Sequence, residues 1–369
     1  MIEPHSGRIR AALLATAAVL VLASCARQPP AGSTVVPEPP AEAAAATMER
    51  ADADMAAVLD ALASLGGKPI ETLSATEARA QPTPADAVKL VMSRQGIQPP
   101  EQVASATDRT INGEGGEIPI RIYTPEGQGP FPVIVYYHGG GWVIADLDTY
   151  DASARALARE AGAIVVASHY RQGPEHKFPA AHDDAFRAYQ WTVANAMALG
   201  GDPDKIAVAG ESAGGNMATA VSLRARDTGI TQPVHELLIY PVAGSDMNTA
   251  SYQENADAKP LNKPMMAWFM QQYLNPGDAQ DPRINLVEAD LGGLPPTTII
   301  GAQIDPLRSE GQALAERLEA AGVPVAYRVY DGVTHEFFGM GAVVDDARDA
   351  QEFAGARLKA SFADAAPGG

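Results

Sequence analysis

The chain has 369 residues, of which 46% are hydrophobic and 20% charged, and its formal net charge is −18. A chain of this length and composition can bury a large core, which predicts one large domain with an elaboration, or two domains. No basic stripe accompanies the strong acidity. The sequence therefore argues against a nucleic-acid partner, which needs clustered lysine and arginine, and we interpret the charge as serving solubility.

The N-terminus carries the pattern of an export signal. Arg8 and Arg10 precede an apolar run over 11–22, and small residues lead to Cys25, the single cysteine of the chain. This pattern is typical of a secretory signal, because the apolar run is too short for a transmembrane helix. A single cysteine also excludes a disulfide within the chain and a cysteine-based zinc site.

The end of this segment, Leu-Ala-Ser-Cys over 22–25, resembles the signal of bacterial lipoproteins. The resemblance implies removal of residues 1–24, a lipid on Cys25, and a membrane as partner of the exported protein. It favours the outer membrane over the inner one because Ala26, rather than aspartate, follows the cysteine. The alternative is an ordinary secretory signal with an incidental cysteine, which leaves the protein secreted or periplasmic.

The next two segments differ from the rest of the chain. Residues 25–46 are rich in proline and alanine, which predicts a spacer without a core. Residues 47–105 have apolar residues at helical spacing, first over 55–65 and again over 85–95, with glycine or proline after each run. We therefore expect a small helical segment before the main domain.

From residue 106 on, short apolar runs alternate with helical stretches. The predicted strands are 118–123, 132–137, 163–168, 205–209, 236–240, 297–301 and 325–330. The predicted helices are 150–161, 179–198, 213–226, 264–274 and 308–321, and residues 362–369 are predicted to be a frayed tail. Apolar strands that alternate with helices indicate an α/β fold with a mostly parallel sheet covered on both faces.

A candidate nucleophile lies in the segment 205–216, KIAVAGESAGGN. The segment predicts a strand, a tight turn and a helix start, and its G-x-S-x-G pattern would expose the hydroxyl of Ser212 above the sheet. The amide of Ala213 opens the helix and can point at a developing oxyanion. Such a turn also occurs in α/β proteins without catalysis, so the interpretation of Ser212 depends on its partners.

Two further features supply these partners. The loop HGGGW over 138–142 follows a predicted strand, and its glycines let amide donors approach an acyl carbonyl. Asp305 and His335 each follow a strand, at the edge where α/β folds place their sites. The order Ser212, Asp305, His335 is that of α/β-hydrolases, in which the histidine is the base and the carboxylate orients it. The remaining histidines precede the serine or begin a strand: His5, His138, His169, His176, His182 and His235.

The sequence contains five separated motifs in order: HGGGW (138–142), YRQGPEHKFPAAHDD (170–184), GESAGGN (210–216), DPLRSEG (305–311) and DGVTHEF (331–337). Together they resemble the hormone-sensitive-lipase-like esterases of the α/β-hydrolase superfamily, over about residues 110–345. The resemblance implies an α/β-hydrolase fold with a helical cap. It also implies hydrolysis of short- to medium-chain acyl esters through an acyl-enzyme, without a metal or an organic cofactor.

The resemblance assigns roles to individual residues. Ser212 would be the nucleophile, His335 the general base and acid, and Asp305 the carboxylate that orients the histidine. The implied oxyanion donors are the backbone amides of Gly140, Gly141 and Ala213. His138 would brace the glycine loop.

The resemblance also divides the chain into parts. The cap would come from 47–105 with a contribution from 245–290, and the catalytic domain would span 106–369. The second cap segment is rich in methionine and aromatic residues, which predicts either an adaptable substrate-binding wall or ordinary helix core. One departure from the family is His169, which stands where the family has aspartate before a Tyr-Arg pair. We expect this departure to alter the packing of the loop, with the fold and reaction retained.

Two alternative functions are left open by the residues. A serine peptidase or amidase could use the same triad, although no propeller-like domain precedes the hydrolase region. A catalytically inactive surface-binding protein could use the same fold as a receptor, although all three triad residues are present. A homodimer is also left open, and the expected ligand is a small-molecule ester.

Overall fold

The computed structural model describes residues 47–99 and 103–365. The predicted signal over 1–24, Cys25 and the spacer over 25–46 lie outside the described residues. Within the described ranges, no helix is both long and apolar enough to span a membrane.

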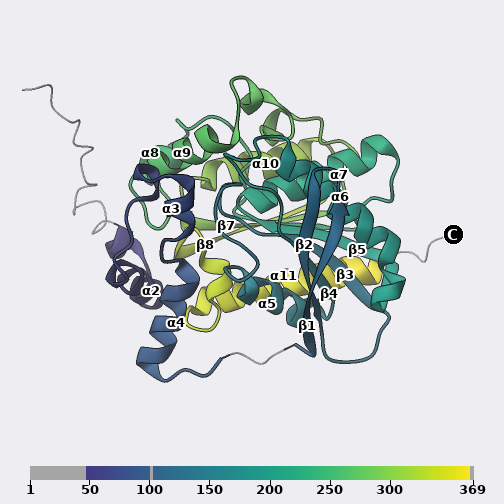
Figure 1. Cartoon of the computed structure of the whole chain (residues 1–369), viewed down its shortest axis with the longest axis horizontal. Coiled ribbons are helices and arrows are strands. Elements are labelled where there is room, and N and C mark those ends of the chain that lie inside the picture. The colour runs from purple at the N-terminus through teal and green to yellow at the C-terminus, as the bar shows by residue number, and fades with distance from the viewer. Residues whose placement is uncertain (1–46, 100–102, 366–369) are drawn as a thin grey trace, which may run out of the picture. The chain divides into compact units, whose positions relative to one another are not determined.

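An eight-stranded sheet forms the centre of the described chain (Figure 1), in the order β1-β2-β4-β3-β5-β6-β7-β8. The strands are β1 (Ser105–Gly113), β2 (Gly116–Thr124), β3 (Phe131–Tyr137), β4 (Ile164–Ser168), β5 (Gly201–Glu211), β6 (Glu236–Ile239), β7 (Thr297–Ile304) and β8 (Val325–Thr334). β1 and β2 form an antiparallel hairpin, β2 pairs antiparallel with β4, and all other pairs are parallel. The predicted α/β fold with a mostly parallel sheet is confirmed.

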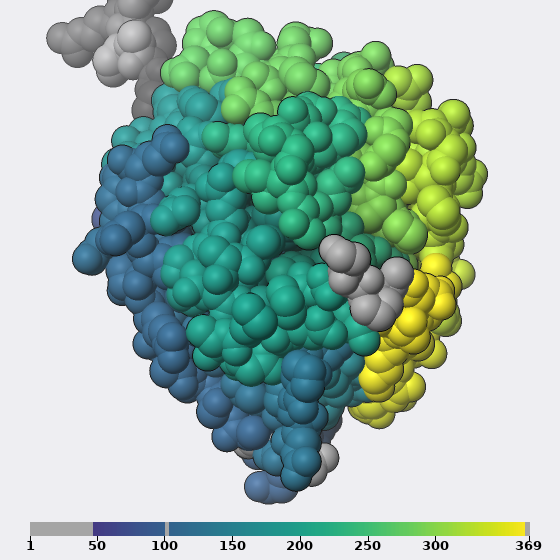
Figure 2. All heavy atoms as spheres, turned by 90° about the vertical axis from the view of Figure 1, so that its right-hand side faces the viewer, coloured from purple at the N-terminus to yellow at the C-terminus, as the bar shows by residue number. Residues whose placement is uncertain are grey.

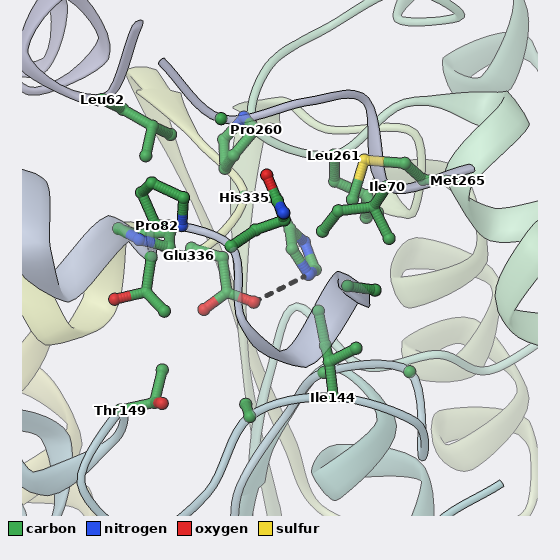
Figure 3. A pocket seen from close by; sticks show the side chains of 18 of the residues that line it. Leu62, Ile70, Pro82, Ile144, Thr149, Pro260, Leu261, Met265, His335 and Glu336 are labelled. Atoms are coloured by element: carbon green, nitrogen blue, oxygen red, sulfur yellow. Dashed lines mark ion pairs between the residues drawn. The ribbon is translucent and has the colours of Figure 1, made fainter. Parts of the chain in front are cut away.

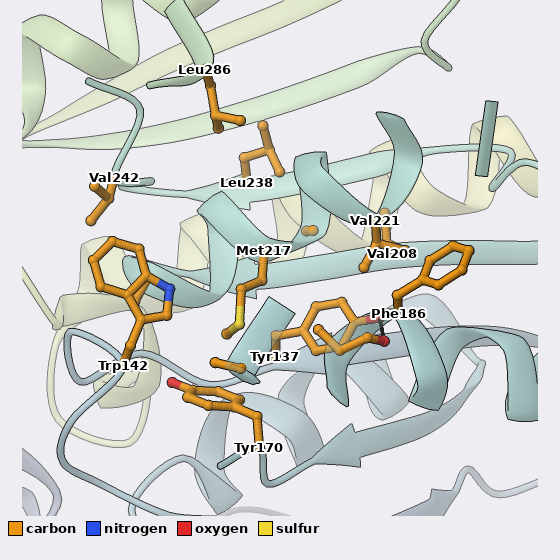
Figure 4. Close-up of a cluster of buried hydrophobic side chains, with 14 of the residues drawn as sticks. Tyr137, Trp142, Tyr170, Phe186, Val208, Met217, Val221, Leu238, Val242 and Leu286 are labelled. Atoms are coloured by element: carbon orange, nitrogen blue, oxygen red, sulfur yellow. Dashed lines mark hydrogen bonds between the residues drawn. The ribbon is translucent and has the colours of Figure 1, made fainter. Parts of the chain in front are cut away.

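Helices cover both faces of the sheet, which is why the central strands are apolar on both sides. Alternate residues of β3 belong to different cores: Val133, Val135 and Tyr137 face the core that includes residues of α6 (Ala180–Asn195), α7 (Ala213–Thr228) and α10 (Arg308–Ala320). Ile134 and Tyr136 face the other core, which includes α5 (Asp151–Ala161) and α11 (Asp345–Asp364). Figure 4 shows the first core, in which Met217 and Val221 of α7 lie over the sheet. On the face in Figure 2, the teal middle of the chain forms most of the surface, with the yellow α11 beside it.

The predicted cap segments form helices. The first contains α2 (Ala53–Ser64), η1 (Ile70–Thr72), α3 (Ala75–Arg79) and α4 (Pro84–Gln95), and the second contains α8 (Ala250–Glu254), α9 (Lys263–Tyr273), η3 (Asp278–Gln280) and η4 (Leu286–Glu288). The remaining short helices are η2 (Met197–Leu199) and η5 (Phe337–Met340). Ser74 and Thr83 begin α3 and α4 with reciprocal capping boxes. The indole nitrogen of Trp268 in α9 donates to the carbonyl of Leu73 over 3.2 Å, so the two segments contact each other.

Two elements differ from the sequence prediction. β1 was not predicted as a strand, because its first six residues are exposed and carry no apolar alternation. The prediction of a frayed tail from 362 is wrong for its first residues, because α11 continues to Asp364 and Phe362 is only 3% exposed. The last residues of that predicted tail, 366–369, lie outside the described chain.

Candidate active site

The turn around Ser212 holds its backbone in a strained conformation. Ser212 has φ 55° and ψ −118°, between the end of β5 and the start of α7. A β-carbon on Gly210 would lie 2.2 Å from the backbone of Gly214, and one on Gly214 would lie 2.0 Å from the carbonyl oxygen of Tyr137. Only glycine fits at both positions, so the two glycines of the motif permit the close turn that presents the serine hydroxyl.

Ser212, His335 and Asp305 lie in one hydrogen-bonded row at the carboxyl ends of β5, β7 and β8. Nε2 of His335 is 3.0 Å from Oγ of Ser212. Nδ1 of His335 is 2.7 Å from Oδ2 of Asp305, and all three residues are buried. When Nδ1–H donates to the carboxylate, Nε2 is left with a lone pair that can accept the serine proton. The structure thus brings together the three residues that the sequence singled out.

The carboxylate of Asp305 is held in place by the chain that follows it, and its charge raises the pKa of His335. Oδ1 of Asp305 accepts a hydrogen bond of 2.8 Å from the amide of Leu307. Burial lowers the pKa of His335, but the carboxyl groups of Asp305, Glu336 and Glu211 outweigh burial, so the net shift of this pKa is upward. An imidazolium that forms when the histidine takes a proton is therefore stabilised at this position.

The glycine loop presents two amides beside the serine. Gly140 and Gly141 have φ of 94° and 59°, and a β-carbon on Gly141 would lie 2.2 Å from the ring of Phe269. Within the described chain, no group accepts a hydrogen bond from either amide, and both residues line a cavity together with Ser212. Ala213 is the first residue of α7, where an amide has no acceptor within the helix. All three predicted donors are thus available to a ligand oxygen.

His138 lies under the glycine loop in a stack of aromatic rings. Its ring centroid is 4.4 Å from that of Tyr170, its Nδ1 is 2.8 Å from the carbonyl oxygen of Gly139, and its Nε2 is 3.0 Å from Nδ1 of His169. Burial lowers the pKa of His138 to about 3, so the ring is neutral. Nδ1–H therefore donates to the carbonyl, and Nε2 accepts from His169. His169, the departure from the family pattern, is thus a direct partner of His138.

Two side chains from distant segments hold the chain after the glycine loop. Nε2 of Gln172 donates to the carbonyls of Ile144 and Ala145 over 2.8 and 2.9 Å. Nε of Arg79, at the end of α3, donates to the carbonyl of Val143 over 2.8 Å. The first cap segment therefore contributes directly to the position of the oxyanion loop.

A buried carboxyl group lies beside the nucleophile. Glu211 accepts hydrogen bonds from the hydroxyls of Tyr136 and Tyr240, the first over 2.6 Å. Burial, together with the nearby Glu336, raises the pKa of Glu211 to about 7. The ring of Tyr240 lies 4.5 Å from that of His335, so this carboxyl group and the catalytic row belong to one packed unit.

A second carboxyl group, Glu336, lies beside the catalytic histidine. It has φ 73°, in the left-handed region, and both of its oxygens accept from the hydroxyl of Tyr150, over 2.7 and 2.8 Å. Its Oε1 is 3.8 Å from Nε2 of His335 (Figure 3). Neither residue is predictable from the sequence, because 186 positions separate Tyr150 from Glu336 and no local pattern joins them.

A cavity of about 710 Å³ opens onto Ser212, His335 and Glu336. Both cap segments contribute apolar side chains to its wall: Leu62, Ile70, Leu261, Met265 and Phe269. Figure 3 shows Leu62, Ile70 and Pro82 from the first segment opposite Ile144 and Thr149. This volume is typical of pockets for small organic ligands. Among the described residues, no group of three or more histidine or acidic side chains is arranged to hold a metal ion.

The other histidines lie outside this row. His182 contacts the hydroxyl of Tyr273 and the side chain of Asn216, over 2.9 and 3.0 Å. His235 lies 2.8 Å from the hydroxyl of Ser361 in α11. Burial lowers the pKa of both, to about 4 for His182 and about 3 for His235, which is typical of neutral core histidines.

Comparison with known families and structures gives consistent matches. A family model described as "alpha/beta hydrolase fold" matches residues 134–339. Carboxylesterase NlhH of Mycobacterium tuberculosis is 42% identical over 279 residues, which are 73% of this chain and 88% of that protein. An ethyl acetate hydrolase of Pseudomonas putida is 35% identical over 76% of this chain and 88% of its own length.

Solved structures agree with these matches. An esterase of Pyrobaculum calidifontis has a TM-score of 0.73 and 37% identity, over 80% of this chain and 95% of that one. An α/β-hydrolase from the metagenome of Lake Arreo, solved as a Ser161Ala mutant, has a TM-score of 0.77 and 36% identity, over 85% of this chain and 99% of that one. The match to the family model over 134–339 includes Ser212, Asp305 and His335.

Proposed function

Because the chain belongs to the α/β-hydrolase family, as a serine hydrolase of its hormone-sensitive-lipase-like branch, we propose that it hydrolyses carboxylic esters through Ser212, His335 and Asp305. The observation that carries the proposal is the hydrogen-bonded row in which Nε2 of His335 lies 3.0 Å from Oγ of Ser212. A serine alcohol is a weak nucleophile at neutral pH, and this contact supplies the base that it needs.

The reaction would proceed in two steps. Ser212 attacks the ester carbonyl while Nε2 of His335 takes its proton, and the same proton then passes to the leaving alcohol. The tetrahedral oxyanion accepts hydrogen bonds from the amides of Gly140, Gly141 and Ala213, and each such donor contributes about 10²–10³-fold in rate in comparable sites. Water then hydrolyses the acyl-serine with His335 as base again. No step requires a metal or an organic cofactor.

Short- to medium-chain acyl esters are the proposed substrates. The cavity of about 710 Å³ supports this class, because its apolar wall from the two cap segments suits an acyl or alcohol chain of limited length. The similar Pseudomonas putida protein is named for an ester of this kind, ethyl acetate. The substrate would thus be a small uncharged ester.

The proposal is tested with a series of p-nitrophenyl esters and with aminoacyl anilides as amide counterparts. Wild-type protein should hydrolyse the esters, and an organophosphonate probe should label it. Ser212→Ala should lose both properties while its circular dichroism stays unchanged. Ser222→Ala is the matched control, because this serine is also buried, in α7, but contacts the carbonyl of Ala218 and the carboxyl group of Glu236 and no member of the catalytic row.

The outcomes separate the rival functions. Faster cleavage of anilides than of esters would favour a peptidase or amidase. Absence of both labelling and turnover in the wild type would favour an inactive binding protein. Ester turnover that survives in Ser212→Ala would remove the serine from the mechanism.

We also propose that the enzyme is exported and anchored by a lipid on Cys25. The support is the signal-like segment over 1–24 and the cysteine that follows it. Bacteria that express the full chain should incorporate labelled palmitate into the protein and retain it in the membrane fraction. Cys25→Ser should lose the label and leave the membrane fraction, whereas a wild type without label would indicate an ordinary secretory signal.

A further inference from the structure

Glu336 combines an unfavourable backbone conformation with a position in the site. Its φ of 73° and ψ of 3° lie in the left-handed region, which favours glycine. A residue with a side chain persists in such a conformation only where its surroundings enforce it, and such positions cluster at functional sites. The residue lines the same cavity as Ser212 and His335.

Tyr150 fixes the carboxylate of Glu336. The tyrosine hydroxyl donates to both oxygens, over 2.7 and 2.8 Å, and its ring stacks against that of His138 at a centroid distance of 5.8 Å. Oε1 of Glu336 keeps accepting capacity beyond this one donor. The carboxylate is therefore held in place with an acceptor site facing the cavity.

The distance between Oε1 of Glu336 and Nε2 of His335 is 3.8 Å. This is too long for a direct hydrogen bond, but one water oxygen can reach both atoms at usual lengths of about 2.7–3.0 Å. In the acyl-enzyme, Oγ of Ser212 carries the acyl group, so Nε2 becomes available to such a water. The water would then donate one O–H to the histidine and the other to the glutamate.

We propose that Glu336 orients the water that hydrolyses the acyl-enzyme and so favours hydrolysis over acyl transfer to alcohols. The water oxygen forms a bond to the acyl carbon, and its first proton passes to Nε2 of His335. The bond between the acyl carbon and Oγ of Ser212 then breaks, and His335 returns that proton to the serine. The second O–H of the water donates a hydrogen bond to Glu336. Its proton stays on the water oxygen and becomes part of the carboxylic acid product. This inference rests on the proposed function.

An alcohol has a single O–H group, so it lacks the second hydrogen that a water donates to Glu336. When methanol attacks the acyl-enzyme, its single O–H is directed to His335, and a methyl group stands where the second O–H of water would be. Loss of the glutamate should therefore slow attack by water and leave attack by methanol nearly unchanged. A merely structural role of Glu336 would disturb His335 and slow both nucleophiles equally.

The test measures the ratio of methyl ester to free acid formed from a p-nitrophenyl ester at fixed methanol concentrations. In Glu336→Gly, for which the backbone conformation is comfortable, the ratio should rise about tenfold, the size expected for one hydrogen bond to a charged group. Glu336→Gln should raise it in the same direction, and Tyr150→Phe should raise it by less. Glu310→Gln is the matched control, because it alters another buried carboxyl group that does not line the cavity.

An unchanged ratio in both Glu336 variants would overturn the inference, whether or not total turnover falls. An equal rise in Glu310→Gln would overturn it as well, since the effect would then follow from the removal of a buried carboxyl group outside the cavity. Absence of any p-nitrophenol release from the wild type would overturn the proposed function itself. The two failures are therefore distinguishable in one set of measurements.

Discussion

Replacement of Asp305 by asparagine should impose the wrong tautomer on His335. Oδ1 of Asp305 accepts from the amide of Leu307 over 2.8 Å, so in the variant this position must be the carbonyl oxygen of the asparagine. The amide NH₂ group then occupies the position of Oδ2, which lies 2.7 Å from Nδ1 of His335. Nδ1 becomes the acceptor, and the ring proton moves to Nε2, where it faces Ser212 as a donor.

A histidine in this tautomer cannot accept the serine proton. The same exchange in another serine hydrolase lowers kcat about 10⁴-fold with the geometry intact, and we expect a loss of that order here. The assay is kcat for p-nitrophenyl acetate, with circular dichroism and urea unfolding as measures of the fold. A loss of less than about tenfold in a folded variant would refute the tautomer argument.

The pH profile supplies a second readout of the same variant. Activity requires neutral His335, so the rate should rise as pH passes the pKa of this group. Burial lowers this pKa, and Asp305 is the largest of the influences that raise it above its ordinary value. The rising limb of kcat/KM should therefore move to lower pH in Asp305→Asn, and a shift to higher pH would contradict the assignment.

Three further outcomes follow from the structure. Gly214→Ala should destabilise the protein by about 3 kcal/mol in urea unfolding, because the added β-carbon would lie 2.0 Å from the carbonyl oxygen of Tyr137; near-wild-type stability would contradict the close turn. Met265→Trp should fill part of the cavity and lower kcat/KM for an octanoate ester about tenfold relative to acetate, whereas equal loss for both esters would place the side chain outside the acyl path. Burial raises the pKa of Glu310 to about 8, so its contribution to stability is fully present below the ordinary value of 4.5 and is lost as pH rises toward 8. Glu310→Gln should weaken the dependence of the unfolding free energy on pH in this range, as measured by urea unfolding. An unchanged dependence on pH would show that the carboxyl group is ionised in the folded protein.

The central strands could be predicted because burial on both faces leaves an apolar run, as in β4, where every residue is buried. β1 could not be predicted in this way, since it pairs with β2 while most of its side chains are exposed and only Ile111 is buried. The helix α11 could not be predicted from its hydrophobic pattern for a different reason. Its buried positions are mostly small, and Ala347, Ala350 and Ala354 give little hydrophobic contrast against the charged residues between them.

The catalytic row could be predicted because each of its members follows a strand. Parallel strands end at one edge of the sheet, so Ser212, Asp305 and His335 are adjacent in space despite their separation in the chain. The contact between Tyr150 and Glu336 does not follow from the order of the strands in this way. Tyr150 lies at the start of α5 after an irregular loop, and its reach to Glu336 depends on the path of that loop.

His169 stands where the family has aspartate, and this difference determines the tautomer of His138. An aspartate at this position would accept a hydrogen bond from His138, which would place the ring proton of His138 on Nε2. With histidine at 169, Nε2 of His138 is the acceptor and its proton lies on Nδ1, directed at the carbonyl of Gly139 over 2.8 Å. That carbonyl precedes the amide of Gly140, so the exchange of aspartate for histidine adds a donor to the peptide group that forms the oxyanion hole. Because such a hydrogen bond polarises the peptide, it makes the amide of Gly140 a stronger donor to an oxyanion.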